Sequence, residues 1–168
     1  PTVRQQIIAN ESQLINQIAK DVSPSVVSVN VTSTTTTRGF FGLSQARQQS
    51  AGTGVIIDTN GTIITNRHVV PEGTEKVSVT LSDGTKLSEV SVIGRTNEND
   101  SLDIAFLKVT NNQGKKLMPA KIGDSSKVQV GDKVVAIGNA LGQFQNTVTS
   151  GIISGFGRSI EAGEADGS

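Results

Sequence analysis

A histidine and an aspartate are the two residues of this sequence whose types and positions could perform catalysis together. His68 is the only histidine in the chain and lies in the segment IITNRHVV, while Asp103 directly precedes the apolar run IAFLKV. A carboxylate at the start of a buried strand is costly unless it finds a partner, and an imidazole Nδ1–H is a suitable one. In serine hydrolases, histidine takes the hydroxyl proton while a carboxylate fixes the imidazole tautomer and stabilises the imidazolium. On these residues alone, a packed core histidine remains the alternative.

Other common kinds of site find little support in the sequence. The chain has no cysteine, which excludes a cysteine nucleophile and thiolate zinc sites, and one histidine excludes a multi-histidine metal site within it. The glycine-rich pieces GTG (52–54) and GNALG (138–142) lack the lysine of a phosphate-binding loop. The carboxylates are scattered, so no glycosidase-type acid/base couple is indicated. Lys+Arg and Asp+Glu both number 15 and no basic cluster occurs, which argues against nucleic-acid binding.

An amphipathic helix is predicted at the start of the chain. Pro24 should end this helix, and the apolar residues that recur at helical spacing before it are Ile7, Ile8, Leu14, Ile15 and Ile18. This apolar face could pack on its own domain or mediate self-association. No apolar stretch approaches the roughly 20 residues of a membrane-spanning helix, and the first residues do not resemble a signal peptide.

The rest of the sequence predicts an all-β fold built from many short strands. Asn60-Gly61 and Asp83-Gly84 are typical of tight hairpin turns. Segment 38–52 is predicted as a glycine-punctuated loop whose Phe40 and Phe41 cover a nearby core, or form a lid or a subunit contact. Strands and hairpins are expected at 25–37, 53–59, 62–70, 76–95, 103–109, 131–140 and 147–158. Strands with turn signals at this spacing favour a barrel or sandwich in a single domain.

Four ordered blocks of the sequence resemble the HtrA/Deg family of trypsin-like serine proteases. The segment VSPSVVSV (22–29) is also similar to the first barrel strand of that family. The blocks are TGVIIDTNGTIITNRHVV (53–70), LDIAFLKV (102–109), IGDSSKVQVGDKVVAIGNALG (122–142) and NTVTSGIISGFGR (146–158). The resemblance runs from Val22 to Ser159, and several blocks in one order are a more specific signal than any single motif.

The resemblance implies a chymotrypsin/trypsin-like fold of two six-stranded antiparallel β-barrels with the active site between them. By position, His68 matches the general base of the family and Asp103 its orienting aspartate, whereas Asp100, in the polar segment NENDS, matches neither. The resemblance implies no metal and no cofactor. It also implies unfolded or misfolded polypeptide substrates, assembly into homotrimers, and a location in the bacterial cell envelope, in the periplasm or another extracytoplasmic space.

The nucleophile of the family lies in a GNSGG block that this sequence does not contain. Ser150 and Ser154 fall in a stretch that resembles a barrel strand preceding that block, so neither is assigned as the nucleophile. Three explanations for the absence of the GNSGG block stay open. The chain has been nicked and a serine-bearing C-terminal fragment stays bound, or the chain ends where order is lost, or it is a non-catalytic half used for binding. The flexible composition of EAGEADGS favours the nick. Alone, the chain is expected to be inactive.

The predicted organisation has a complete first barrel and a partial second one. Its parts are an N-terminal helical segment at 1–21, the first barrel at 22–118, the first strands of the second barrel at 119–160, and a flexible loop end at 161–168. The leading hypothesis is a serine endopeptidase of protein quality control. One alternative is a non-catalytic barrel that binds unfolded chains as a chaperone does. The other is an unrelated barrel with His68 in its core.

Overall fold

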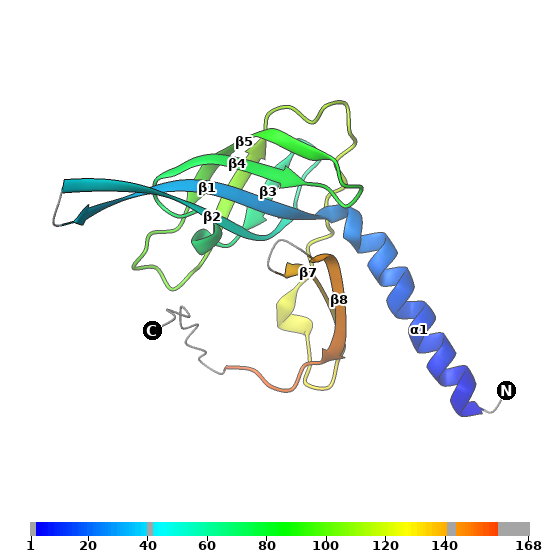
Figure 1. Ribbon diagram of the computed structural model, residues 1–168. Coiled ribbons are helices and arrows are strands. Elements are labelled where there is room, and N and C mark those ends of the chain that lie inside the picture. The colour runs from blue at the N-terminus through cyan, green and yellow to red at the C-terminus, as the bar shows by residue number, and fades with distance from the viewer. Residues whose placement is uncertain (1–2, 40–41, 141–143, 158–168) are drawn as a thin grey trace.

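The computed structural model describes residues 3–39, 42–140 and 144–157. Figure 1 shows a closed barrel, a separate two-stranded sheet beside it, and one N-terminal helix that extends past that sheet. This arrangement confirms the prediction of an all-β fold with a closed six-stranded antiparallel barrel, a partial second sheet and a short N-terminal helical element. The predicted flexible end at 161–168 lies outside the described residues.

Helix α1, Val3–Val22, ends where the sequence predicts. Pro24 lies in the short 3-10 turn Ser23–Ser25 that follows the helix. A proline ring disfavours α-helical backbone at the preceding residue, so α1 does not continue through this turn. Neither α1 nor any other helix in the described part of the chain has the length and apolar character needed to cross a membrane.

One side of α1 packs on the two-stranded sheet. Leu14, Ile15 and Ile18 line an apolar groove whose other wall includes Val134 of strand β7, Lys133–Ala140. An ion pair of 2.8 Å between Glu11 and Lys133 joins the same two elements. Part of this apolar face therefore lies beside its own chain, while Leu14 stays 59% exposed, and self-association through the face stays a prediction. The side chains of Ile7 and Ile8 lie outside the described part.

The six barrel strands pair antiparallel in the closed order β1-β2-β3-β6-β5-β4. Their bounds are β1 Val26–Gly39, β2 Gly42–Ile56, β3 Thr62–Thr65, β4 Thr74–Thr80, β5 Lys86–Arg95 and β6 Ala105–Val109. Both predicted hairpin turns are confirmed, because Gly61 and Gly84 adopt φ angles of +89° and +83° that favour glycine. The largest fully buried side chains are Ile56, Ile63, Leu87, Leu107, Val27, Val29, Val70 and Val79.

The prediction of a loop at 38–52 is wrong for the described residues of that segment. Strands β1 and β2 pair without interruption from Val26 opposite Val55 to Gly39 opposite Gly42, and the pairing extends beyond the barrel as a two-stranded arm (Figure 1). The β-branched threonines at 34–37 continue β1, and their backbone groups are satisfied by residues 44–47 of the opposite strand. This long-range pairing outweighs the weak strand preference of the glycine and glutamine residues in β2. Phe40 and Phe41, with the roles predicted for them, lie outside the described residues.

A second, smaller sheet is formed by β7 and β8, Phe144–Ile152, which pair antiparallel. It sits close to barrel strand β2: a Cβ placed on Gly138 of β7 would lie 3.4 Å from Thr53 Oγ1. Val134 and Ile152 are exposed on this sheet. The barrel is therefore closed and packed, whereas the described part of the second sheet is not.

A close approach of backbone and side chains at Gly54 gives a test of the barrel core. A Cβ at Gly54 would lie 2.8 Å from Ile63 Cγ2 and 2.9 Å from Val29 Cγ2, and both partners are fully buried, stiff β-branched side chains. We expect Gly54→Ala to reduce the free energy of unfolding by about 1–3 kcal/mol through overpacking. Urea unfolding of the wild type and the variant measures this difference.

Gly94→Ala is the matched control, because Gly94 is also a strand glycine but has no atom within 4 Å of the position of an added Cβ. Its effect should stay within about 0.5 kcal/mol. Equal stabilities of the Gly54→Ala and Gly94→Ala variants would contradict the described packing of β1, β2 and β3.

Candidate active site

The antiparallel pairing of β3 with β6 brings the histidine and aspartate segments to one edge of the barrel. Thr65, the last residue of β3, lies opposite Ala105, the first residue of β6. The chain therefore leaves β3 and enters β6 at the same place, although these residues are far apart in the sequence. His68 follows the first of these points and Asp103 precedes the second, so the sheet register alone puts the two residues near one another.

His68 lies in a 3-10 turn, Arg67–Val69, rather than in the strand predicted over 62–70. Backbone bonds from Val69 N–H to Asn66 O and from Val70 N–H to Arg67 O close the turn, and both valines are buried. The His68 side chain is 68% exposed. A tight turn anchored by two buried valines thus presents the imidazole to solvent, and His68 is not a packed core residue.

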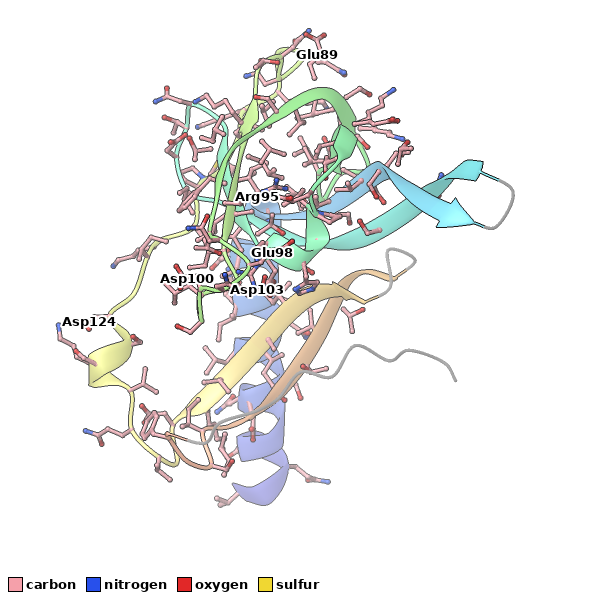
Figure 2. All side chains as sticks on the ribbon, turned by 90° about the vertical axis from the view of Figure 1, so that its left-hand side faces the viewer. Glu89, Arg95, Glu98, Asp100, Asp103 and Asp124 are labelled. Atoms are coloured by element: carbon pink, nitrogen blue, oxygen red, sulfur yellow. The ribbon has the colours of Figure 1, made fainter. Side chains whose placement is uncertain are left out.

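Asp103 lies at the end of the loop between β5 and β6. The loop is braced at its base by Thr96, whose N–H donates to Ile104 O at 2.9 Å and whose hydroxyl donates to Leu102 O. Asp100 accepts a bond of 2.9 Å from Leu102 N–H within the same loop. Figure 2 shows Asp103 at the end of the barrel that faces the β7–β8 hairpin. The Asp103 carboxylate is 36% exposed, so it is only partly shielded from water.

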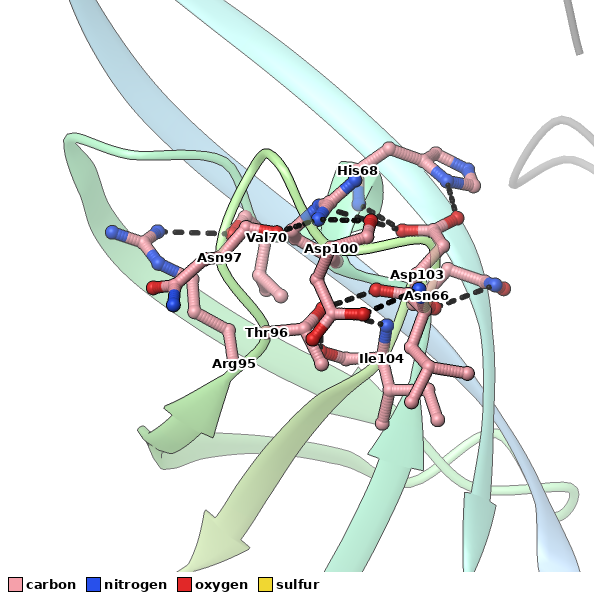
Figure 3. Close-up of polar contacts among 11 residues, drawn as sticks. Asn66, His68, Val70, Arg95, Thr96, Asn97, Asp100, Asp103 and Ile104 are labelled. Atoms are coloured by element: carbon pink, nitrogen blue, oxygen red, sulfur yellow. Dashed lines mark hydrogen bonds and ion pairs between the residues drawn. The ribbon is translucent and has the colours of Figure 1, made fainter.

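Both carboxylate oxygens of Asp103 bond to His68. Oδ2 lies 2.5 Å from the ring Nδ1, and Oδ1 accepts the backbone N–H of residue 68 at 3.0 Å (Figure 3). An ionised carboxylate only accepts hydrogen bonds, so the neutral ring carries its proton on Nδ1 and leaves Nε2 as an acceptor. The pair thus presents an oriented base with an exposed nitrogen.

The surroundings of Asp103 favour its ionised form. Partial burial disfavours the charge, but the hydrogen bonds from the His68 ring and backbone, together with the nearby charge of Arg67, outweigh it and hold the pKa of Asp103 below its ordinary value. Asp103 is therefore a carboxylate at neutral pH and can stabilise a positive charge that develops on the ring. Asp100, the other aspartate of the segment, bonds to the loop backbone instead.

Two residues beside His68 contact the aspartate loop and were not singled out from the sequence. The Asn66 side-chain amide donates to Asp103 O at 3.2 Å, and Arg67 reaches three residues of the loop. The signal available in the sequence was their position next to the histidine. Ser150, in contrast, lies within β8 opposite Val135, and Ser154 follows the end of that strand.

Within the described ranges, no group of three or more His, Cys, Asp or Glu residues is arranged to hold a metal ion. The hydrogen bonds between Asp103 and His68 allow proton transfer at Nε2 of His68, with charge stabilisation by Asp103.

Comparisons with known proteins identify the family to which the chain is similar. The trypsin-like peptidase domain family matches residues 52–168. The putative serine protease HhoB of Synechocystis sp. is 38% identical over 170 residues, which cover 90% of this chain and 39% of the relative. The serine protease Do-like HtrB of Bacillus subtilis is 38% identical over 167 residues, which cover 95% of this chain and 35% of the relative. The probable periplasmic serine endoprotease DegP-like of Brucella suis is 42% identical over 120 residues.

Solved structures agree with these relatives. The HtrA-type protease AlgW with decapeptide superposes with a TM-score of 0.67 and 29% identity, covering 86% of this chain and 46% of that chain. A second AlgW structure with decapeptide gives a TM-score of 0.72 and 31% identity. The chain thus spans less than half the length of these relatives and structures. From the family match, the relatives and the shared fold, we conclude that this chain belongs to the trypsin-like peptidase family, in its HtrA/Deg group.

Proposed function

We propose that this chain is the part of an HtrA-type serine endopeptidase that supplies the general base His68 and the orienting acid Asp103. The observation that carries the proposal is the two-point bond between Asp103 and His68 beneath an exposed imidazole. A histidine in this state can accept a proton at Nε2 and share the resulting charge with the carboxylate.

The proposed reaction is acyl transfer to a serine and then to water. His68 takes the hydroxyl proton of the serine as its oxygen attacks the peptide carbonyl, and returns that proton to the leaving amine. In the second half, His68 takes a proton from water as the water attacks the acyl-enzyme, and returns that proton to the serine oxygen as the acid product leaves. Backbone N–H donors stabilise each tetrahedral oxyanion, a contribution of about 3–4 kcal/mol per donor. The serine and these donors come from peptidase-domain residues outside this sequence, on the same polypeptide or on a bound C-terminal fragment.

The proposed substrates are unfolded or misfolded polypeptides outside the cytoplasm. The relative from Brucella suis is named a probable periplasmic serine endoprotease, and the AlgW structures contain a decapeptide. These names support polypeptide cleavage in the cell envelope, and we extend them to a homotrimeric protein-quality-control protease as the sequence resemblance implies. A barrel that only binds unfolded chains is the competing function.

The first prediction concerns the choice between the two aspartates of the loop. In the full-length protein, we expect Asp103→Asn to lower kcat/KM for an unfolded protein substrate by about 10³- to 10⁴-fold, because the amide no longer fixes the productive tautomer or neutralises the imidazolium. Asp100→Asn is the matched control, since an asparagine oxygen can still accept the bond from Leu102 N–H. It should stay within about threefold of the wild type. Equal losses in the two variants would contradict the assignment of Asp103.

A second prediction concerns acid stability. The pKa of Asp103 is lower in the folded protein than its ordinary value, so its ionised form stabilises the fold above the unfolded pKa of about 3.9. This contribution is lost as the pH falls through the folded-state pKa. The stability difference between the wild type and Asp103→Asn should therefore shrink as the pH falls from about 5 to about 3. Urea unfolding across this range measures the difference, and a difference that grows between pH 5 and pH 3 would contradict the lowered pKa of Asp103.

A fluorophosphonate probe separates cleavage from binding alone. The full-length protein should react at one serine, identified by peptide mass mapping, and His68→Ala should slow the reaction by about 10³-fold or more because the hydroxyl is no longer deprotonated. Intact mass under denaturing conditions shows whether that serine lies on the same polypeptide or on a second one. Absence of labelling in the wild type would instead support the binding function.

A further inference from the structure

Arg67 bridges the turn that carries His68 and the loop that carries Asp103. Its Nη1 donates to the backbone carbonyl of Asn97 and lies 3.4 Å from the carbonyl of Asp100. Its Nε lies 4.0 Å from Asp103 Oδ1. The guanidinium thus touches the loop at three residues, and its side chain is only 22% exposed.

The acceptors of Arg67 lie on both sides of one tight turn of the loop. Asp100 N–H donates to Asn97 O at 3.0 Å, so the same two residues that close the turn also present carbonyls to Arg67. A planar guanidinium has five N–H donors in a fixed geometry and can hold several acceptors at once, which a lysine ammonium on a flexible stem does less well. The contact is therefore suited to fixing the loop backbone as well as to balancing charge.

The loop has little other support from apolar packing. Residues 97–102 are all exposed, including Leu102. Glu98, Asp100 and Asp103 also bring three carboxylates to this end of the barrel (Figure 2), and like charges that are close together disfavour a compact loop. A segment with few buried contacts opens readily, so its position relative to the His68 turn depends on polar contacts such as those of Arg67.

We propose that Arg67 is a positioning residue for the His68–Asp103 pair: its guanidinium fixes the loop of residues 97–103 so that the carboxylate stays within bonding distance of the imidazole. The proposal rests on the proposed protease function for its effect on rate. Arg67 touches neither substrate nor the ring in this account. Its neighbour Asn66 adds a second contact to the loop through Asp103 O at 3.2 Å. The residues that hold the loop are thus adjacent in sequence to the base.

The test compares three variants of the full-length protein. Arg67→Met keeps the aliphatic volume and removes every hydrogen-bond donor of the side chain. Arg67→Lys keeps the positive charge but lacks the planar guanidinium with its fixed N–H donors. Arg95→Met is the matched control, because the Arg95 side chain, at 31% exposed, also bonds a backbone carbonyl and a carboxylate, but on the Val70–Glu72 segment. Each variant is measured for kcat and KM, for the fluorophosphonate reaction rate, for thermal stability, and for amide hydrogen exchange of a peptide that covers 96–104.

We expect Arg67→Met to lower kcat by about 10- to 100-fold, since small displacements of a catalytic group cost this much, while KM changes by less than about twofold. Exchange in the 96–104 peptide should rise by about tenfold or more through local opening. Arg67→Lys should recover less than half of the lost kcat, because charge alone does not hold two carbonyls. Arg95→Met should leave kcat and the exchange of the loop tip near their wild-type values.

Three results would overturn the proposal: wild-type kcat and exchange in Arg67→Met, an equal loss of kcat in Arg95→Met, or full activity in Arg67→Lys. If Arg67→Met is unfolded at the assay temperature, the Arg67→Lys result decides. If the wild type itself neither cleaves nor reacts with the probe, the proposed function fails. In that case hydrogen exchange alone still decides whether Arg67 holds the loop.

Discussion

The two-point bond between Asp103 and the residue at position 68 holds the candidate active site together. A single hydrogen bond to Nδ1 would leave the carboxylate free to rotate, whereas the additional bond from the backbone N–H fixes its plane relative to the ring. That geometry requires a turn and a loop from distant parts of the sequence to stay in register. The closed barrel meets this requirement because β3 and β6 are neighbours, and Thr65 and Ala105 pair at the edge where both segments emerge. Buried valines on the turn and polar contacts on the loop complete the arrangement.

Much of the fold was predictable because local signals and global structure agree. Pro24 ends the helix, Gly61 and Gly84 supply the positive φ angles of two hairpins, and alternating valines mark the inner face of β1. The choice of Asp103 over Asp100 also followed from position, since only Asp103 borders a buried strand, and the structure gives the two residues different partners. The catalytic roles of His68 and Asp103 remain predictions that the proposed experiments test.

The remainder depends on long-range contacts that leave no local pattern. The strand over 42–52 contains glycine, serine and glutamine, and it forms because β1 offers an unbroken partner along its whole length. The 3-10 turn at His68 interrupts what reads as a continuous strand. Arg67 binds backbone carbonyls, and a carbonyl acceptor has no sequence signature.

The state of the His68 ring tests the central claim most directly. In the full-length protein with ¹⁵N-labelled histidine, His68 can be assigned by its loss in His68→Ala, and the two ring nitrogens report their protonation separately. The account predicts that the neutral ring carries its proton on Nδ1, hydrogen-bonded to Asp103, with Nε2 unprotonated and able to accept a proton from serine. A neutral ring protonated on Nε2 would contradict the account, because it would place a donor where the base is needed.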